Sequence, residues 1–155
     1  MILDGKKLRD ELLISYKEKI SKDNLSITLA IILVGDDEAS KLYIKNKEKY
    51  CSMVGINVIK YLLPKETSEE ELISLIKSLN EKEEVTGIIL QSPVPSNINF
   101  DKCSGLINEN KDVDGFTKDN VYNLYLNKKG ILPCTVKGII RLLDSYNILL
   151  SGKDV

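Results

Sequence analysis

Apolar residues change their spacing several times along this chain, and each change marks an expected helix or strand. Near the N-terminus they recur three or four positions apart, which is typical of one face of an amphipathic helix. Asp4 can cap a helix over about residues 6–20, because its carboxylate can accept hydrogen bonds from the first free backbone N–H groups. The short apolar stretch over residues 25–34 then predicts a strand that is covered on both faces.

The same alternation of patterns continues through the first two thirds of the chain. The next expected elements are a helix over 38–53 that Gly55 closes and a strand over 56–63 that Pro64 stops. A further helix begins with a capping box at Thr67 or Ser68 with Glu70 and Glu71 and runs to about Asn80. A strand over 85–91 follows it. Strand and helix therefore alternate three times. This order predicts an α/β fold, a three-layer αβα domain with a mainly parallel sheet.

The last third of the chain has a less regular pattern. We expect a short helix over residues 100–107 capped by Asp101, a tight turn in KDVDGF at 111–116, and a linking helix over 135–146. The final residues SGKDV place a glycine turn before what would be another strand. Two interpretations stay open: Val155 closes a short edge strand, or the chain is the front part of a longer protein.

Composition excludes several classes of protein. With 155 residues, 43% of them hydrophobic and 29% charged, the chain has the size and balance of one globular domain. Its net charge of −1 argues against nucleic-acid binding, and neither a membrane span nor a signal peptide is visible, so we expect a cytoplasmic protein. Histidine is absent, which leaves Lys, Asp, Glu, Tyr or Cys for acid–base chemistry.

The three cysteines, Cys51, Cys103 and Cys134, are odd in number and far apart. No CxxC pair occurs, so the pattern indicates neither a disulfide framework nor a zinc site, and we expect no metal. Small apolar packing residues are the expected role for all three.

The first candidate site residues are Tyr43 and Lys47, on the helix expected after Gly35. Residues four apart share a helix face, and ligands of open α/β sheets bind beyond the carboxyl ends of the strands. Lys47 could then exchange protons and Tyr43 could offer a flat surface to an aromatic ligand. The alternative is plain packing on a half-exposed helix.

Two loops supply the other candidates. Gln91 follows an expected strand, can both donate and accept hydrogen bonds, and is followed by Pro93, which would stiffen the loop. Asp112 and Asp114 lack the further ligands of a calcium loop, but one unpaired carboxylate could accept two N–H bonds from an aminopyrimidine-like ring. An ordinary turn is the alternative for each loop.

Four segments in this order carry a family resemblance: VGDDEASKLYIKNKEKYCSMVGI, GIILQSPVP, KDVDGFTKDNVYNLY and LPCTVKGIIRLL. Together they resemble the bifunctional methylenetetrahydrofolate dehydrogenase/methenyltetrahydrofolate cyclohydrolase family over nearly the whole chain. The resemblance implies an enzyme of one-carbon metabolism and purine biosynthesis that oxidises 5,10-methylenetetrahydrofolate with NAD(P) and hydrolyses the methenyl product to 10-formyltetrahydrofolate.

The resemblance also implies roles for single residues. Lys47 would help to activate water in the cyclohydrolase step, Gln91 would interact with Lys47, and Tyr43 would pack over the folate ring system. These three are the expected catalytic residues. Asp114 would hold the pterin, and Ser40 and Pro93 join Tyr43, Gln91 and Asp114 as expected substrate-binding residues.

The resemblance covers only the front of the family's chain. It implies a folate-binding catalytic domain over residues 1–120, with linker helices and the start of an absent NAD(P)-binding domain over 121–155. The parent would be a homodimer and the fragment a monomer. Two departures, Val136 for a proline and Thr117 for a frequent histidine, are expected to act only locally. Alternatives are a stand-alone folate-binding module without catalysis and a structural domain that has lost the site.

Overall fold

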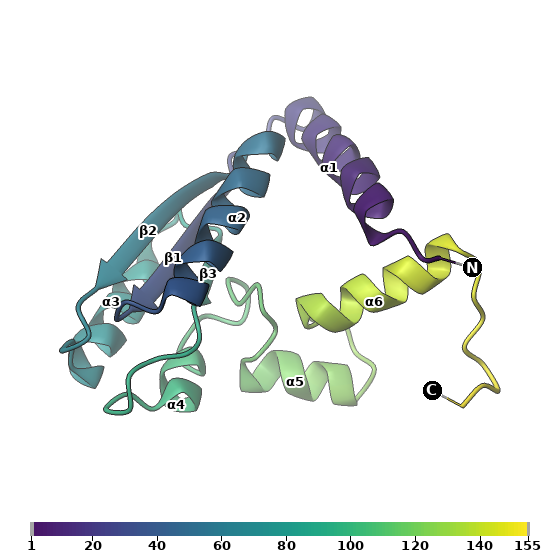
Figure 1. The fold of residues 1–155 in the computed structure, drawn as a ribbon. Helices are drawn as coiled ribbons and strands as arrows, with labels where there is room; N and C mark the ends of the chain where they lie inside the picture. Colours follow the sequence, from purple (N-terminus) through teal and green to yellow (C-terminus); the bar gives the residue numbers. More distant parts are fainter. Residues whose placement is uncertain (1, 155) are drawn as a thin grey trace.

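Three parallel strands form the centre of the fold (Figure 1). A computed structural model of the protein describes residues 2–154. In it, β1 (Thr28–Val34) lies between β2 (Asn57–Leu63) and β3 (Gly87–Leu90). The predicted parallel sheet is thus confirmed, and its carboxyl edge leads into the loops that follow each strand.

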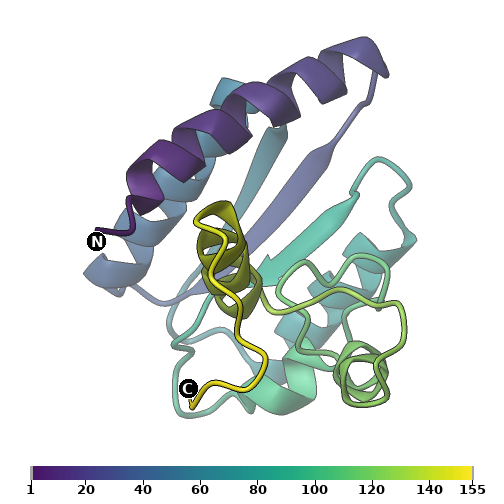
Figure 2. The same cartoon turned by 90° about the vertical axis from the view of Figure 1, so that its right-hand side faces the viewer.

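Helices cover both faces of this sheet. The helices of residues 2–154 are α1 (Gly5–Lys22), α2 (Glu38–Val54), α3 (Glu69–Glu81), α4 (Phe100–Ser104), α5 (Lys118–Tyr125) and α6 (Cys134–Ser145). The helix α2 packs on one face and α3 on the other, while α1 packs against α2. Figures 1 and 2 show α5 and α6 set to one side of the sheet.

The side-chain alternation of β1 explains why the sheet needs two covering layers. Ala30, Ile32 and Val34 point to the α3 face, where they join Leu72 and Ile76 in the larger core cluster. The intervening residues Ile31 and Leu33 pack with Ile44 of α2. Since successive side chains of a strand point to opposite faces, a continuous apolar strand must be buried on both.

Three of the predicted capping signals act where the sequence places them. Asp4 accepts a hydrogen bond from the Lys7 N–H at 3.0 Å, and Ser68 and Glu71 form a reciprocal capping box at the start of α3. Gly55 closes α2 with φ +89°, a left-handed conformation that glycine adopts without a steric penalty.

Two tyrosine hydroxyls tie α6 to the N-terminal segment. The Tyr146 hydroxyl accepts a hydrogen bond from the Asp4 N–H at 2.8 Å, and Arg141 donates to the Tyr16 hydroxyl at 2.7 Å. The expected linking helix therefore exists as α6, and its position depends on contacts with residues more than one hundred positions earlier in the chain.

Several sequence predictions need correction. The cap of α4 is Asn99, whose side chain accepts from the Lys102 N–H at 2.9 Å, whereas Asp101 lies in the first turn of the helix. The short helix α4 ends at Ser104, before the expected boundary. The pattern over residues 118–125 gave no prediction of α5. The edge strand suggested at Val155 falls outside the described residues. No helix within residues 2–154 combines the length and apolar character needed to cross a membrane.

Candidate functional site

A hydrogen bond between two distant elements defines the candidate site. Lys47, on α2, donates from Nζ to Oε1 of Gln91 at 3.1 Å, and Gln91 directly follows the last residue of β3. The backbone N–H of Gln91 also donates to the Ile32 carbonyl of β1 at 2.8 Å, which fixes its place beside the sheet. Two residues predicted separately from sequence thus meet at the carboxyl edge of the sheet.

The loop after β3 is fastened to the first turn of α2 through one carbonyl group. The Ser92 carbonyl accepts from Gln91 Nε2 at 2.8 Å and from the buried Ser40 hydroxyl at 3.3 Å. The peptide between Ser92 and Pro93 is cis, and Pro93 itself is exposed. Ser40 therefore links this loop to α2, and Pro93 lies at the protein surface.

Tyr43 lies one turn before Lys47 on α2 and is largely free. Its side chain is 64% exposed and makes no hydrogen bond among the contacts of the described residues. A large exposed aromatic ring beside a site residue offers a flat surface on which a planar ligand can stack.

Asp114 is the half-buried carboxylate of the candidate site. Burial raises the pKa of Asp114, the Lys47 ammonium opposes that rise, and the carboxylate of Asp112 adds to it. Lys47 is thus a charged group that acts on Asp114. A carboxylate held this way is suited to accept N–H donors from a ligand, which would stabilise its ionised form.

Asp112 has a different role from Asp114. Its side chain is 2% exposed and accepts hydrogen bonds from the backbone N–H groups of Gly115 at 2.9 Å and Thr117 at 2.7 Å, and from Asn120 Nδ2 at 3.0 Å. Within residues 2–154, no three His, Cys, Asp or Glu side chains gather as a metal site would require. Because Asp112 organises the turn at 111–116 as a buried carboxylate, the interpretation of this segment as an ordinary turn is incomplete.

Cys134 is a residue that sequence reasoning assigned wrongly. It was expected to pack as a small apolar side chain, yet it is exposed at the start of α6, and its thiol donates to the Val113 carbonyl at 3.2 Å. Burial of its sulfur and the nearby Asp114 carboxylate raise the pKa of the Cys134 thiol. Cys103 is buried as predicted, and Cys51 is half-buried.

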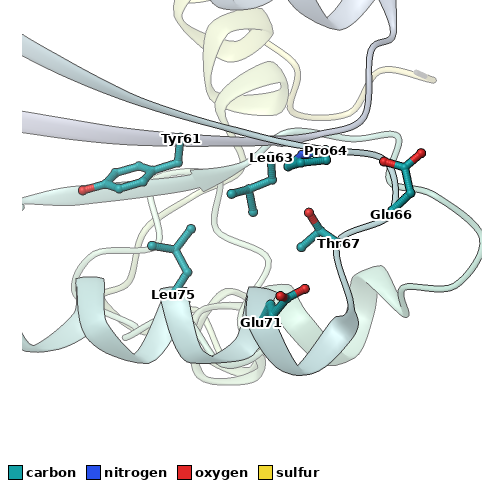
Figure 3. Close-up of a pocket in the computed structure, with 7 residues that line it drawn as sticks. All are labelled: Tyr61, Leu63, Pro64, Glu66, Thr67, Glu71 and Leu75. Atoms are coloured by element: carbon teal, nitrogen blue, oxygen red, sulfur yellow. The ribbon is translucent and has the colours of Figure 1, made fainter.

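The hollow drawn in Figure 3 lies elsewhere. It has a volume of about 470 Å³ and lies between β2 and α3. Tyr61, Leu63 and Leu75 line it, together with Glu66 and Glu71. None of the six predicted site residues lines it. Lys47 comes from α2 on the opposite face of the sheet, so the chemistry of the candidate site does not depend on this hollow.

The turn between β1 and α2 is a poor fit for a dinucleotide. Its single glycine, Gly35, is followed by Asp36 and Asp37, and the Asp37 carboxylate already accepts the Ser40 N–H at 2.7 Å. A pyrophosphate at this helix start would meet two negative charges and an N–H that is already used. The residues that follow β1 therefore do not form a nicotinamide-cofactor site.

Known proteins resemble this chain in both sequence and structure. The bifunctional protein FolD of Lachnoclostridium phytofermentans is 42% identical over 99% of the chain and 56% of its own length. The crystal structure of the bifunctional FolD methylenetetrahydrofolate dehydrogenase/cyclohydrolase of Campylobacter jejuni superposes with a TM-score of 0.96 at 41% identity, over 99% of this chain and 56% of that one. A silkworm 5,10-methylenetetrahydrofolate dehydrogenase gives 0.93 at 36% identity, over 95% and 52%.

The chain thus spans about half the length of the relatives that it matches. The model of the tetrahydrofolate dehydrogenase/cyclohydrolase catalytic domain matches residues 3–114, a stretch that ends at Asp114 and contains Lys47 and Gln91. With the sheet, the Lys47–Gln91 contact and these matches in agreement, the chain belongs to the tetrahydrofolate dehydrogenase/cyclohydrolase family.

Proposed function

We propose that this chain is the folate-binding catalytic half of an enzyme that oxidises 5,10-methylenetetrahydrofolate with NAD(P) and hydrolyses the methenyl product to 10-formyltetrahydrofolate. The observation that carries the proposal is the hydrogen bond from Lys47 to Gln91 at 3.1 Å, beside a half-buried Asp114 and an exposed Tyr43. Family membership supports the same assignment.

Of the two reactions, hydrolysis is the one for which this chain supplies the side chains. A water oxygen adds to the cationic methenyl carbon and loses one proton to leave a hydroxyl group. The bond from that carbon to N5 then breaks as N5 gains a proton, and the hydroxyl loses its second proton to become the formyl C=O, so one proton is released in all. Lys47 assists the water. One N–H group of its side chain is bonded to Gln91 Oε1, and its remaining hydrogen-bonding positions are free to face the substrate. Gln91 is in turn oriented by its own bond to the Ser92 carbonyl.

Binding of the pterin falls to Tyr43 and Asp114. The aromatic ring of Tyr43 packs over the folate ring system, and the Asp114 carboxylate accepts two N–H bonds from the aminopyrimidine edge. Ser40 and Pro93 border the pocket. The half-buried position of Asp114 strengthens such contacts, since fewer water molecules compete for the carboxylate.

When bound, the nicotinamide cofactor would accept the hydride, and a second half of the protein would hold this cofactor. Residues 1–120 then form the folate-binding domain and 121–155 the linker toward that half. We further propose a cytoplasmic enzyme that supplies one-carbon units for purine synthesis. Its full-length form would be a homodimer joined through the cofactor half, and this chain alone a monomer.

Calorimetric titration with 5-formyltetrahydrofolate tests the proposal directly. This reduced folate carries a formyl group on N5 and so cannot form the methylene bridge, which keeps binding separate from chemistry. We expect the 155-residue chain to bind it and the Asp114→Ala variant to lose that binding. Asp119→Ala, which removes an exposed carboxylate from α5, serves as the matched control.

The outcomes separate the alternatives. Equal heats for the Asp114→Ala variant and the unaltered chain would remove Asp114 from the pterin site. Binding without hydrolysis of 5,10-methenyltetrahydrofolate by any form of the protein would favour a folate-binding module without catalysis. An absorbance assay should detect no hydride transfer to NAD(P) from this chain alone, and a clear signal would contradict the assignment of the cofactor to a second half.

A further inference from the structure

We infer that Asp112 is a positioning residue that, together with Asn120, fixes the backbone from which Asp114 presents its carboxylate to the folate site. The inference rests on the proposed function for its ligand and on the contacts of residues 109–134 for its geometry. Its test separates failure of the inference from failure of that function.

The peptide groups on both sides of Asp114 are held. The Val113 carbonyl accepts the Cys134 thiol at 3.2 Å, and the Gly115 N–H donates to Asp112 Oδ1 at 2.9 Å. The first of these peptides governs φ of Asp114 and the second governs ψ. With both fixed, the Asp114 side chain leaves the backbone in one direction only.

Asp112 is itself fixed to the sheet. It pairs in a parallel bridge with Ile88, and the Ile88 N–H of β3 donates to the Lys111 carbonyl at 2.7 Å. Gly87 makes this approach feasible, because a Cβ there would lie 2.6 Å from a side-chain carbon of Val113. The backbone of Asp112 is therefore tied to β3, the strand that directly precedes Gln91.

Asn120 links this anchor to the segment before α6. Its Nδ2 donates to Asp112 Oδ2 at 3.0 Å, and its Oδ1 accepts the Ile131 N–H at 2.9 Å. The Ile131 carbonyl in turn lies so near Gly115, which has φ +72°, that a Cβ there would stand 2.8 Å from it. The segment before α6 thus contacts the residue that follows Asp114 in the loop.

The buried charge of Asp112 is well satisfied by these donors. Burial alone would raise the pKa of Asp112, but hydrogen bonds from Thr117 and Asn120 outweigh it and lower the pKa. Asp112 therefore keeps its negative charge, which favours the neutral form of Asp114. The charged groups that act on the pKa of Asp114 are Lys47 from α2, which lowers it, and Asp112, which raises it. The Asp114 carboxylate in turn raises the pKa of the neighbouring Cys134 thiol at the start of α6.

The Asp112→Asn variant tests the inference with little change in volume. One amide can place its oxygen toward Gly115 or toward Thr117 and Asn120, but its NH₂ group then faces N–H donors on the other side. We expect 5-formyltetrahydrofolate to bind tenfold more weakly or worse. Carbon-13 NMR of aspartate-labelled chain should also show a lower pKa for Asp114, because the neighbouring negative charge is gone. Asp119→Asn removes the same formal charge from an exposed position and should change neither quantity.

A folded Asp112→Asn variant with unaltered affinity and an unaltered Asp114 pKa would overturn the inference, since a purely stabilising residue would behave so. If that variant does not fold, Asn120→Ala replaces it, because Asp112 then keeps its two backbone donors. Unaltered folate affinity of the Asn120→Ala variant would overturn the inference. If the unaltered chain binds no folate, the proposed function fails at that step. The Asp114 pKa in Asp112→Asn then still decides whether Asp112 acts on Asp114.

Discussion

Lys47 and Gln91, forty-four positions apart, meet through a hydrogen bond of 3.1 Å between Nζ and Oε1. The contact joins the middle of α2 to the end of β3 across the carboxyl edge of the sheet. Because Gln91 is also held by the Ile32 carbonyl, the amine of Lys47 points toward a fixed partner. This arrangement supports a lysine that acts on a bound substrate.

Lys47→Ala should lower cyclohydrolase turnover by at least about 100-fold, the lower end of what a positioned acid–base group contributes. The measurement is hydrolysis of 5,10-methenyltetrahydrofolate by the protein with both halves present. Folate affinity should stay nearly unchanged, because Tyr43 and Asp114 are intact. Lys45→Ala, an exposed lysine on the same helix, is the control and should keep full turnover. Normal turnover by Lys47→Ala would exclude this residue from the mechanism.

Asp114 should make stability depend on pH in a direction set by burial. Since burial raises its pKa, this group contributes fully to stability below its unfolded pKa of about 3.9 and loses that contribution as the pH rises through the higher folded value. Asp114→Asn should therefore gain stability relative to the unaltered chain across this interval. Urea denaturation at several pH values measures the difference, and a difference that stays constant with pH would contradict the expectation.

Folate affinity should depend on pH in the direction opposite to stability. The Asp114 carboxylate must be ionised to accept two N–H bonds, so affinity for 5-formyltetrahydrofolate should fall as the pH drops through its raised pKa. Calorimetric titrations over a pH series provide the measurement. Affinity that does not change with pH in this range would mean that Asp114 does not bind the ligand in its charged form.

Gly115→Ala should destabilise the fold by at least about 1–2 kcal/mol, the cost of a left-handed conformation for a residue with a Cβ. Contact with the Ile131 carbonyl, 2.8 Å from the added carbon, should increase the loss. Gly138→Ala in α6 is the matched control, because nothing lies within 4 Å of its Cβ. It should instead stabilise the helix by up to about 1 kcal/mol. Chemical denaturation compares the two, and equal effects would contradict the account.

Lys111→Met should cost about 1–3 kcal/mol of stability, since it leaves partly buried carbonyl groups without a donor. Lys111 Nζ donates to the carbonyls of Leu79, Asn80 and Lys82 at 3.1, 2.7 and 2.7 Å, and so closes the C-terminal end of α3. Lys77→Met, at an exposed position of α3, should change stability by less than about 0.5 kcal/mol. Urea midpoints measure both variants, and a neutral Lys111→Met would show that water replaces the lysine.

The structure agrees best with sequence predictions that depend on residues near one another. The helix cap at Asp4 and the helix stop at Gly55 were predicted correctly, and of the two predicted caps Thr67 and Ser68 the structure uses Ser68, because each depends on a few neighbouring backbone groups. The prediction of Asp101 as a cap was wrong, since Asn99 supplies an equally suitable side chain two residues earlier. Helix α5 was not predicted, because it has eight residues and buries only Asn120.

The sequence by itself determined the alternation of strands and helices, the two-sided burial of β1 and the residues that carry the family motifs. Only the tertiary structure decided which of these residues meet. The strand order β2-β1-β3 brings Gln91 to Lys47, and the bridge from Ile88 to Asp112 turns a loop carboxylate into an anchor for Asp114. Periodicity and caps reflect local backbone requirements, whereas these contacts depend on how distant segments pack, which no short stretch of sequence specifies.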